Sequence, residues 1–375
     1  MQKIEIHKSI FGGYGLGYID GKACFVPYSV PGDVLNIETV SDKKDYCFGR
    51  IIEIVKESEF RVKPECPNFG TCGGCNYLNI PYEKELEYKV SILNESLSRN
   101  SGDAFTIPEI ELLKDSRYHY RSHASVKTDK NSGAGFYKAD SNTLIPFPTN
   151  GCLLLSDNLN NQIKNLYLSK LSNEIKIAHS TEGINSSGLK QNVIRDTENN
   201  VIFDRDRKLF FQANRFLRKQ MLQKVANYAS LTKSDSFLDI GCGVGFFSIF
   251  LADKAKNGYG IDINNESIKW AKHNAKSNNI KNLTFQNKAA TNIFYFKDKV
   301  NVVIADPPRA GLQKKARKAL KALSPERIIY VSCNPSTFSR DVRDLALNGY
   351  TFEKLTLIDM FPGTHHIEVI GLLQK

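Results

Sequence analysis

A cysteine and a glutamate in the C-terminal part of the chain have the residue types and surroundings needed for nucleophilic catalysis. Cys333 lies between Ser332 and the pair Asn334–Pro335 just after an apolar run, and Glu368 begins another apolar run. A thiolate that adds to C6 of a uracil ring gives C5 the carbanion character it needs to take a methyl group from a sulfonium. A base must then remove the C5 proton before the thiolate can leave. The two positions therefore predict a nucleophile, Cys333, and a base, Glu368.

Both residues also have a structural interpretation. A lone cysteine is often a buried core residue, and Glu368 could be a salt-bridged acid at a strand edge. His365 and His366 are further candidates for the base or for contacts with phosphate. The segment Asp306–Arg309, Asp-Pro-Pro-Arg, favours catalysis because it also follows an apolar strand, where ligands bind in open α/β sheets. Arg309 stands where methyltransferases of exocyclic amines often carry an aromatic residue, which argues against amine methylation.

A glycine-rich turn predicts the cofactor site. Asp239 ends an apolar strand pattern, and Gly241, Gly243 and Gly245 follow before a helical pattern. Glycines let the backbone approach a ligand closely and direct helix N-terminal amides towards it. Asp262 ends the next strand pattern, where it can accept both ribose hydroxyls of an adenosine. This arrangement is typical of class I methyltransferases, which bind S-adenosylmethionine, although NAD enzymes place glycines and an acid similarly.

The composition limits the partners and the compartment. The 375 residues carry a formal net charge of +11. This favours a polyanionic partner such as nucleic acid or an anionic membrane surface, although a solvated lysine-rich surface gives the same balance. No apolar run approaches the roughly 20 residues needed to span a bilayer, and the N-terminus lacks the apolar core of a signal peptide. We therefore expect a cytoplasmic protein without a membrane partner, whose eight cysteines do not form structural disulfides.

The elements expected in the first half are strands and one helix. Residues 1–57 alternate apolar and polar positions between Gly-rich turns, which predicts a small β-barrel, either purely structural or binding single-stranded nucleic acid. Apolar residues at helical spacing predict a helix over 82–99. Residues 105–205 are expected to be rich in strands. Within them, basic and aromatic residues interleave over 117–123, as an RNA-facing surface would need.

From Phe210 onward, the patterns of strands and helices alternate. Helical patterns between the first four strands predict a parallel, doubly wound sheet, and a loop between the last two predicts an antiparallel hairpin at the sheet edge. Just before this fold, Phe211 and Gln212 supply an aromatic ring and an amide that could hold cofactor and base, although Phe211 could equally be core. The six predicted strands are Phe237–Ile240, Gly258–Asp262, Val300–Ala305, Ile328–Ser332, Leu355–Ile358 and Ile367–Leu373.

Five motifs, found in order along essentially the whole chain, resemble those of the RNA uracil-C5 methyltransferase family. The resemblance is to the cluster-containing members with an N-terminal TRAM barrel, which mostly act on 23S ribosomal RNA. The motifs are Cys66-x5-Cys72-Gly-Gly-Cys75, Phe211-Gln212-Ala-Asn214, Asp306-Pro-Pro-Arg-x-Gly, Ser332-Cys333-Asn-Pro and Phe361-Pro-x-Thr-x-His366-x-Glu368.

The resemblance implies a metal site and the roles of several residues. It implies Cys333 as nucleophile and Glu368 as base, with Gln212, Asp262 and Asp306 around the cofactor and the target uracil. It also implies a [4Fe-4S] cluster, although four thiolates also suit tetrahedral zinc and the spacing does not choose between them. Such a metal would staple the central domain, because methyl transfer needs no redox step. The implied ligands are Cys66, Cys72, Cys75 and Cys152.

The sequence departs from the family pattern at three positions. Asp262 stands where the family often has glutamate, which shortens its reach by about one methylene. Phe246 replaces a polar residue that leads the helix after the glycines, so no contact is carried over to it. Gly363 replaces a frequent histidine, which puts in doubt any role of a side chain there.

We therefore predict a three-part chain. A TRAM-like, RNA-binding barrel occupies 1–57, a β-rich central domain with the metal cysteines occupies 58–209, and a class I (Rossmann-like) methyltransferase domain occupies 210–375, with helix 82–99 packing on it. The predicted activity is S-adenosylmethionine-dependent methylation of uridine C5 in RNA. By family analogy, 23S rRNA is favoured over the T-loop of tRNA. An inactive RNA-binding protein and a NAD-linked enzyme are the alternatives. We expect a monomer with no obligate protein partner.

Overall fold

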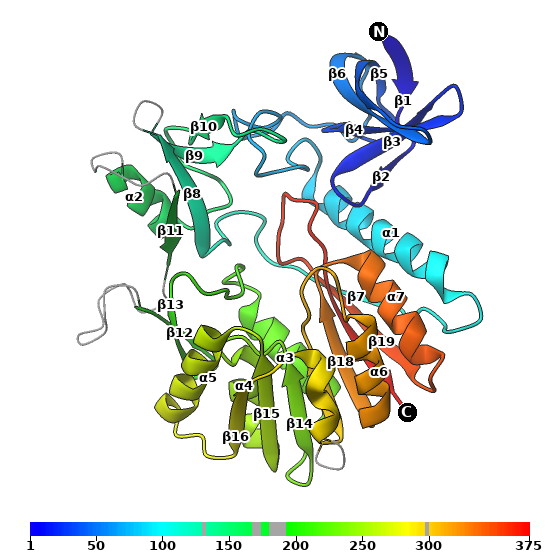
Figure 1. The fold of residues 1–375 in the computed structure, drawn as a ribbon. Coiled ribbons are helices and arrows are strands. Elements are labelled where there is room, and N and C mark those ends of the chain that lie inside the picture. The colour runs from blue at the N-terminus through cyan, green and yellow to red at the C-terminus, as the bar shows by residue number, and fades with distance from the viewer. Residues whose placement is uncertain (130–132, 167–173, 180–192, 297–299) are drawn as a thin grey trace.

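The structure is a computed structural model that describes residues 1–129, 133–166, 174–179, 193–296 and 300–375. Figure 1 shows a small barrel, a β-rich middle region and a large mixed sheet with helices on both faces. Within the described ranges, no helix is long and apolar enough to cross a membrane.

The N-terminal sheet closes on itself. Its six strands have the order β1-β5-β6-β4-β3-β2. Only two residues separate β1 from β2, yet these strands lie at opposite ends of the order, so the sheet curls until its ends meet. Aliphatic side chains and two cysteines fill the interior from alternating positions, as the predicted period of two requires. The strands are β1 Gln2–Glu5, β2 Lys8–Ile10, β3 Tyr14–Ile19, β4 Lys22–Pro27, β5 Val34–Asp42 and β6 Tyr46–Lys56.

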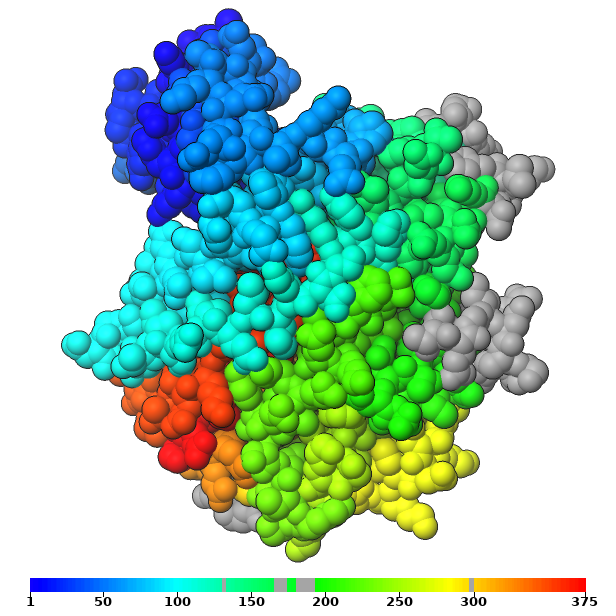
Figure 2. Space-filling model, turned by 180° about the vertical axis from the view of Figure 1, so that it is seen from behind, coloured from blue at the N-terminus to red at the C-terminus, as the bar shows by residue number. Residues whose placement is uncertain are grey.

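Helix α1, Tyr82–Ser101, confirms the helix predicted over 82–99. It packs on α7, Pro335–Ala346, where the hydroxyl of Ser339 donates to the carbonyl of Ser96 at 2.8 Å. Figure 2 shows the cyan surface of α1 and its neighbours between the blue barrel and the orange and red surface of the C-terminal part. Helix α1 is therefore part of the layer of helices that covers one face of the large sheet.

The described part of the middle region consists mainly of strands, as predicted for 105–205. Strands β10-β9-β8-β11 form an antiparallel sheet that packs against α2, and β12 and β13 form a separate hairpin. Residues 130–132, 167–173 and 180–192 of this stretch lie outside the described residues. The elements are β8 His123–Asp129, β9 Gly133–Tyr137, β10 Leu144–Pro146, α2 Asp157–Leu166, β11 Glu174–Ala178, β12 Val193–Glu198 and β13 Val201–Asp206.

The large sheet has eight strands in the order β16-β15-β14-β17-β18-β20-β19-β7. The first five run parallel, β20 runs antiparallel to both of its neighbours, and β7 pairs in parallel with β19. The strands are β7 Ile110–Leu113, β14 Ser236–Ile240, β15 Asn257–Asp262, β16 Leu283–Asn287, β17 Val302–Ala305, β18 Arg327–Ser332, β19 Thr351–Ile358 and β20 Glu368–Gln374.

Helices cover both faces of this sheet because successive strand residues point to opposite sides. In β14, Phe237 packs with α3, α4 and α5, whereas Leu238 packs with α1, α6 and α7. The parallel strands are buried on both faces, which explains why they read as continuous apolar runs in the sequence. The remaining helices are α3 Arg218–Ala229, α4 Phe246–Leu251, α5 Asn265–Ser277 and α6 Lys314–Leu323.

The predicted doubly wound sheet and its antiparallel hairpin are confirmed, with one error of position. The hairpin of β19 and β20 is not at the edge, because β7 pairs with the outer side of β19. Strand β16, at the other edge, was not predicted either. Strand β7 pairs with a strand far along the sequence, whereas β16 pairs with its sequence neighbour β15 but has exposed and half-buried residues in place of a continuous apolar run.

Candidate active site

The glycine turn lies at the carboxyl edge of the parallel strands, between β14 and α4. Gly241 has φ of +80°, and a Cβ there would lie 2.4 Å from the carbonyl oxygen of Asp306. Only glycine therefore allows these two loops to approach each other. Gly243 and Gly245 also have positive φ, and α4 begins directly after Gly245. This edge is where open α/β sheets bind their ligands.

Two of the predicted acids flank this turn. Asp262 accepts hydrogen bonds from the backbone N–H of Gly243 at 3.0 Å and of Asn264 at 2.7 Å. Asp239 is fully buried, and its Oδ2 accepts the backbone N–H of Ser248 at 3.1 Å. Its Oδ1 has no hydrogen-bond partner among the described residues. This oxygen suits a ligand that brings a hydrogen-bond donor or a positive charge.

Asp306 completes a group of three carboxylates at this edge. Burial raises the pKa of Asp239 to about 7, and the nearby Asp262 adds to the rise. Burial likewise raises the pKa of Asp306 to about 7, with further contributions from Asp239 and Asp262. Neighbouring carboxylates disfavour one another's ionisation, so a cationic ligand placed among them would be stabilised.

The predicted nucleophile and base face each other at the ends of paired strands. In the antiparallel pair β18 and β20, Ser332 lies opposite Val369. Continuing this register by one residue puts Cys333 opposite Glu368. Glu368 is only 6% exposed. Burial raises its pKa well above the usual value, Asp306 adds to the rise, and Arg309 opposes it.

The local sequence fixes the position of Cys333. Directly after it, the side chain of Asn334 caps α7 by accepting from the N–H of Ser336 at 3.0 Å, and Pro335 occupies the first turn of the helix. The Asn334 amide also donates to the carbonyl of Arg309 at 3.2 Å, which ties the Asp-Pro-Pro-Arg loop to the same helix start. The sequence motifs are therefore in direct contact.

Arg309 is the cation of this site. Its guanidinium lies 3.2 Å from Nδ1 of His366. Burial lowers the pKa of His366 to about 3, and His365 and Arg309 lower it further. Burial and Arg309 lower the pKa of His365 to about 4. Both rings are therefore neutral near pH 7, so neither adds positive charge to the site.

Gln212 is held by a buried ionic network. Its carbonyl accepts from Nε of Arg218 at 2.7 Å, and Arg218 also pairs with Asp196 at 3.0 Å. The guanidinium groups of Arg218 and Arg205 both lie against the ring of Phe211, with their central carbon atoms 4.6 and 4.2 Å from the ring centre. Phe211 is thus a core residue that positions Gln212, in line with the structural interpretation of its ring.

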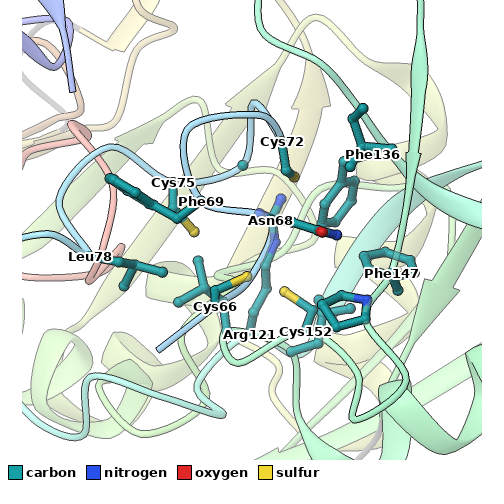
Figure 3. Close-up of a pocket in the computed structure, with 15 residues that line it drawn as sticks. Cys66, Asn68, Phe69, Cys72, Cys75, Leu78, Arg121, Phe136, Phe147 and Cys152 are labelled. Carbon is teal, nitrogen blue, oxygen red and sulfur yellow. The ribbon is translucent and has the colours of Figure 1, made fainter. Parts of the chain in front are cut away.

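The four cysteines of the predicted metal site line one cavity. Figure 3 shows Cys66, Cys75 and Cys152 with their sulfur atoms turned towards a common space, and Cys72 at its rim. Most of the other lining residues are apolar, including Phe136. Burial raises the pKa of Cys75 well above its usual value, and the other three cysteines add to the rise.

This donor set suits a thiolate-bound metal. Neighbouring thiols ionise with difficulty by themselves, and a bound cation would stabilise their thiolate forms. However, in the part of the chain that the structure describes, no group of three or more His, Cys, Asp or Glu side chains is arranged to hold a single metal ion. The four predicted ligands therefore line one cavity, but they are not arranged around a single ion.

Sequence reasoning missed residues that support the site from outside the methyltransferase fold. Asn76 contacts the loop before Glu368, and Lys89 of α1 pairs with Asp359 at 2.7 Å where that loop begins. A lysine on the buried face of a helical pattern was the available signal for Lys89, since lysine is rarely buried without a partner. Asn76 gave no comparable signal.

Comparisons with known proteins agree with this geometry. The family described as tRNA (Uracil-5-)-methyltransferase matches residues 149–375. An uncharacterized RNA methyltransferase of Aquifex aeolicus is 32% identical, over 99% of this chain and 98% of that protein. One of Halalkalibacterium halodurans is 28% identical, over 99% and 96%. The solved structure of Pyrococcus abyssi tRNA (uracil-54, C5)-methyltransferase in complex with S-adenosyl-L-homocysteine has the same fold, with a TM-score of 0.78 at 24% identity, covering 99% of this chain and 100% of that chain.

The fold is that of a class I methyltransferase, whose methyl donor is S-adenosylmethionine. Since the family match spans more than half of the chain and the Aquifex relative is similar over nearly its whole length, the chain belongs to the tRNA (uracil-5-)-methyltransferase family. It is an RNA (uracil-C5) methyltransferase.

Proposed function

We propose that the protein methylates C5 of a uridine in 23S rRNA through a covalent intermediate on Cys333. The observation that carries the proposal is the strand register that places Cys333 opposite Glu368, with Asp306 close enough to raise the pKa of both groups. A nucleophile and a base on adjacent strand ends can reach C6 and C5 of one pyrimidine ring.

The proposed reaction begins with the addition of Cys333 to the uracil ring. Cys333 attacks C6 as a thiolate, and the electron pair of the C5=C6 bond moves to C5. S-adenosylmethionine, held by the glycine turn and Asp262, supplies the methyl group that C5 takes. The Glu368 carboxylate then removes the C5 proton, the double bond re-forms, and Cys333 leaves as a thiolate. The products are 5-methyluridine and S-adenosylhomocysteine.

The charges of the site support an ordered sequence in this proposal. Burial and neighbouring carboxylates raise the pKa of Cys333 to about 11, so the resting side chain is a thiol. A cationic sulfonium beside Asp239, Asp262 and Asp306 would lower the pKa of nearby acids, because an opposite charge favours the ionised form. Cofactor binding would therefore help to ionise Glu368.

A groove in the middle region supports RNA as the substrate. Among its lining residues are four cations and three aromatic rings, and no acidic residue lines it within the described ranges. Such a surface suits phosphates and stacked bases. Its lining includes Phe210, which precedes Gln212 by two residues in the sequence, and the proposed reaction requires the target uridine to be extruded from its RNA into the reaction site. We call this groove the basic groove; its cations and rings are Arg121, Lys176, Arg207, Lys208, Phe136, Tyr137 and Phe210.

We further propose that the cysteine cavity binds a [4Fe-4S] cluster rather than zinc. The support is that four thiols line one largely apolar cavity, because such a cluster is held by four thiolates. Its ligands would be Cys66, Cys72, Cys75 and Cys152, which come from two segments on either side of α1. The cluster would hold these segments together and would take no part in methyl transfer.

A tRNA substrate is the alternative to rRNA. The matching family is described by its tRNA enzymes, and the Pyrococcus structure is of a tRNA methyltransferase, so the T-loop of tRNA is the second candidate. We would map 5-methyluridine by mass spectrometry in rRNA and tRNA from a strain lacking the gene. Loss of one or more rRNA methyl groups would support the proposal. Loss of the tRNA methyl group would keep the chemistry and replace the substrate. No loss in either would favour an inactive RNA-binding protein.

The cytoplasmic location and the monomeric state stay predictions.

A further inference from the structure

Asn76 joins the segment that carries Cys66, Cys72 and Cys75, called here the cysteine-bearing segment, to the loop that precedes Glu368. It directly follows Cys75, and its backbone N–H donates to the carbonyl of Gly363 at 2.8 Å. Its side-chain Oδ1 accepts the backbone N–H of His365 at 3.1 Å and lies 3.0 Å from Nδ1 of the same histidine. One residue thus binds both ends of a three-residue segment.

Glu85 and Leu78 also contact the segment Gly363–His365. The N–H of Gly363 donates to Glu85 at 2.6 Å. Gly363 has φ of +77°, and a Cβ there would lie 3.2 Å from Leu78. A glycine is therefore needed at this departure from the family pattern, because the loop adopts a left-handed conformation against the cysteine-bearing segment.

The contacts of Asn76 also fix the proton on His365. A backbone N–H can only donate, so the Asn76 atom that receives it must be the amide oxygen. The same oxygen faces Nδ1, so Nδ1 of the neutral His365 carries the proton and Nε2 is an acceptor. The His365 ring centre lies 4.2 Å from that of His366, which contacts Arg309. The contacts therefore continue to the cation beside Cys333 and Glu368.

We propose that Asn76 is a positioning residue for methyl transfer, which holds the Gly363–His365 segment and the His365 tautomer and thereby places Glu368 and Arg309. The inference rests on the proposed roles of Cys333 and Glu368. Asn76 touches neither the reacting atoms nor the cofactor turn. It acts through the loop, so its loss affects the catalytic step more than RNA binding.

The test compares three full-length variants, purified without oxygen, in a tritium-release assay on uracil-5-labelled RNA. Asn76→Ala removes the acceptor of two hydrogen bonds, and we expect kcat to fall about tenfold or more with KM for RNA changed less than about twofold. Asn76→Asp keeps the acceptor oxygen and should restore most of kcat. Asn68→Ala is the matched control, because Asn68 lies on the same cysteine-bearing segment but bonds to the Pro146 carbonyl instead. It should leave kcat unchanged.

Two further measurements separate positioning from general damage. Metal content should match between Asn76→Ala and the wild type, and melting curves should show that both are fully folded at the assay temperature. In ¹⁵N-histidine NMR spectra, His365 should lose its Nδ1–H tautomer in Asn76→Ala only. Unchanged kcat and tautomer, activity lost in proportion to metal, or a raised KM with normal kcat would each overturn the proposal. Absence of tritium release from the wild type would instead refute the proposed reaction, and the tautomer measurement would still test the contact.

Discussion

At the scale of single residues, the site raises the pKa of both of its proposed reactive groups. Burial, Glu368 and Asp306 raise the pKa of the Cys333 thiol, and Arg309 opposes the rise. Burial and Asp306 likewise raise the pKa of Glu368 well above its usual value. The free enzyme therefore protects its nucleophile, and the positive charge of the cofactor's sulfonium would lower the pKa of both groups when the cofactor binds.

We predict that Cys333 in the free protein reacts slowly with iodoacetamide near pH 7. Its pKa of about 11 means that the thiolate fraction should rise roughly tenfold per pH unit up to that value. Peptide mass spectrometry of the alkylated protein measures the rate at Cys333 separately from the other cysteines. A plateau of the rate near pH 9 would contradict the assignment.

Replacing Glu368 with Gln should trap the RNA on the enzyme. Cys333 can still add and C5 can still be methylated, but the C5 proton stays and the thiolate cannot leave. A denaturing gel should show a slow-moving protein–RNA species in Glu368→Gln. The double variant with Cys333→Ala should lack it. Normal turnover by Glu368→Gln would remove Glu368 from the mechanism.

At the scale of elements, α1 is bound to the catalytic loop by buried charges. Lys89 donates to Glu85 at 2.8 Å and to Asp359 at 2.7 Å, and all three side chains are fully buried. Lys89 also donates to the carbonyl of Phe361 at 3.2 Å. A helix that lies outside the predicted catalytic domain thus helps to fix the loop of the predicted base.

Lys89→Met should destabilise the protein strongly. It leaves the buried Asp359 without its cation and leaves Glu85 with only Arg117, and breaking a buried ion pair typically costs about 3–5 kcal/mol of unfolding free energy. Lys84→Met on the same helix is the control, because Lys84 pairs with Glu87 at the surface and exposed pairs contribute at most about 1 kcal/mol. Urea titration monitored by circular dichroism gives both values. Equal midpoints would mean that the buried cluster adds nothing to stability.

The sequence alone predicted the parallel strands β14, β15, β17 and β18, the helix over 82–99 and the glycine turn, because each has a local pattern. It also predicted which residues gather at the site, since motifs at the carboxyl ends of parallel strands must share an edge. Strand β7 could not be found this way. It has four residues, and its partner β19 lies more than 200 residues later. The significance of Asn76 likewise depends on contacts with residues far along the chain.

At the scale of the whole molecule, the basic groove lies on the middle region and a second lysine-lined hollow lies on the methyltransferase fold. The second hollow includes Lys254 and Lys281, which precede β15 and β16, at the amino edge of the parallel strands. The proposed reaction site is at the opposite edge. Lysines line both surfaces, which lie at different positions, so the same change of charge can be made in each to test RNA binding.

The double variant Lys176→Gln/Lys208→Gln should weaken RNA binding and reduce its salt dependence. Loss of two contacts to single-stranded phosphates should lower the slope of log K against log salt by about 1.4. Lys254→Gln/Lys281→Gln makes the same change of charge and should leave the slope unchanged. Fluorescence anisotropy with labelled RNA at several salt concentrations measures both. Equal effects of the two double variants would show that only net charge matters.

Strand β20 lies between β18 and β19 in the interior of the large sheet, although it is the last strand in the sequence. This order governs how the protein can be made. While residues 368–374 are still being synthesised, β18 and β19 have no partner between them, and the apolar edges of both remain exposed. The same strand carries Glu368, so a nascent chain acquires its predicted base and its finished sheet in one step. Interrupted translation therefore yields fragments that can neither fold this sheet nor catalyse, and that are targets for chaperones and proteases.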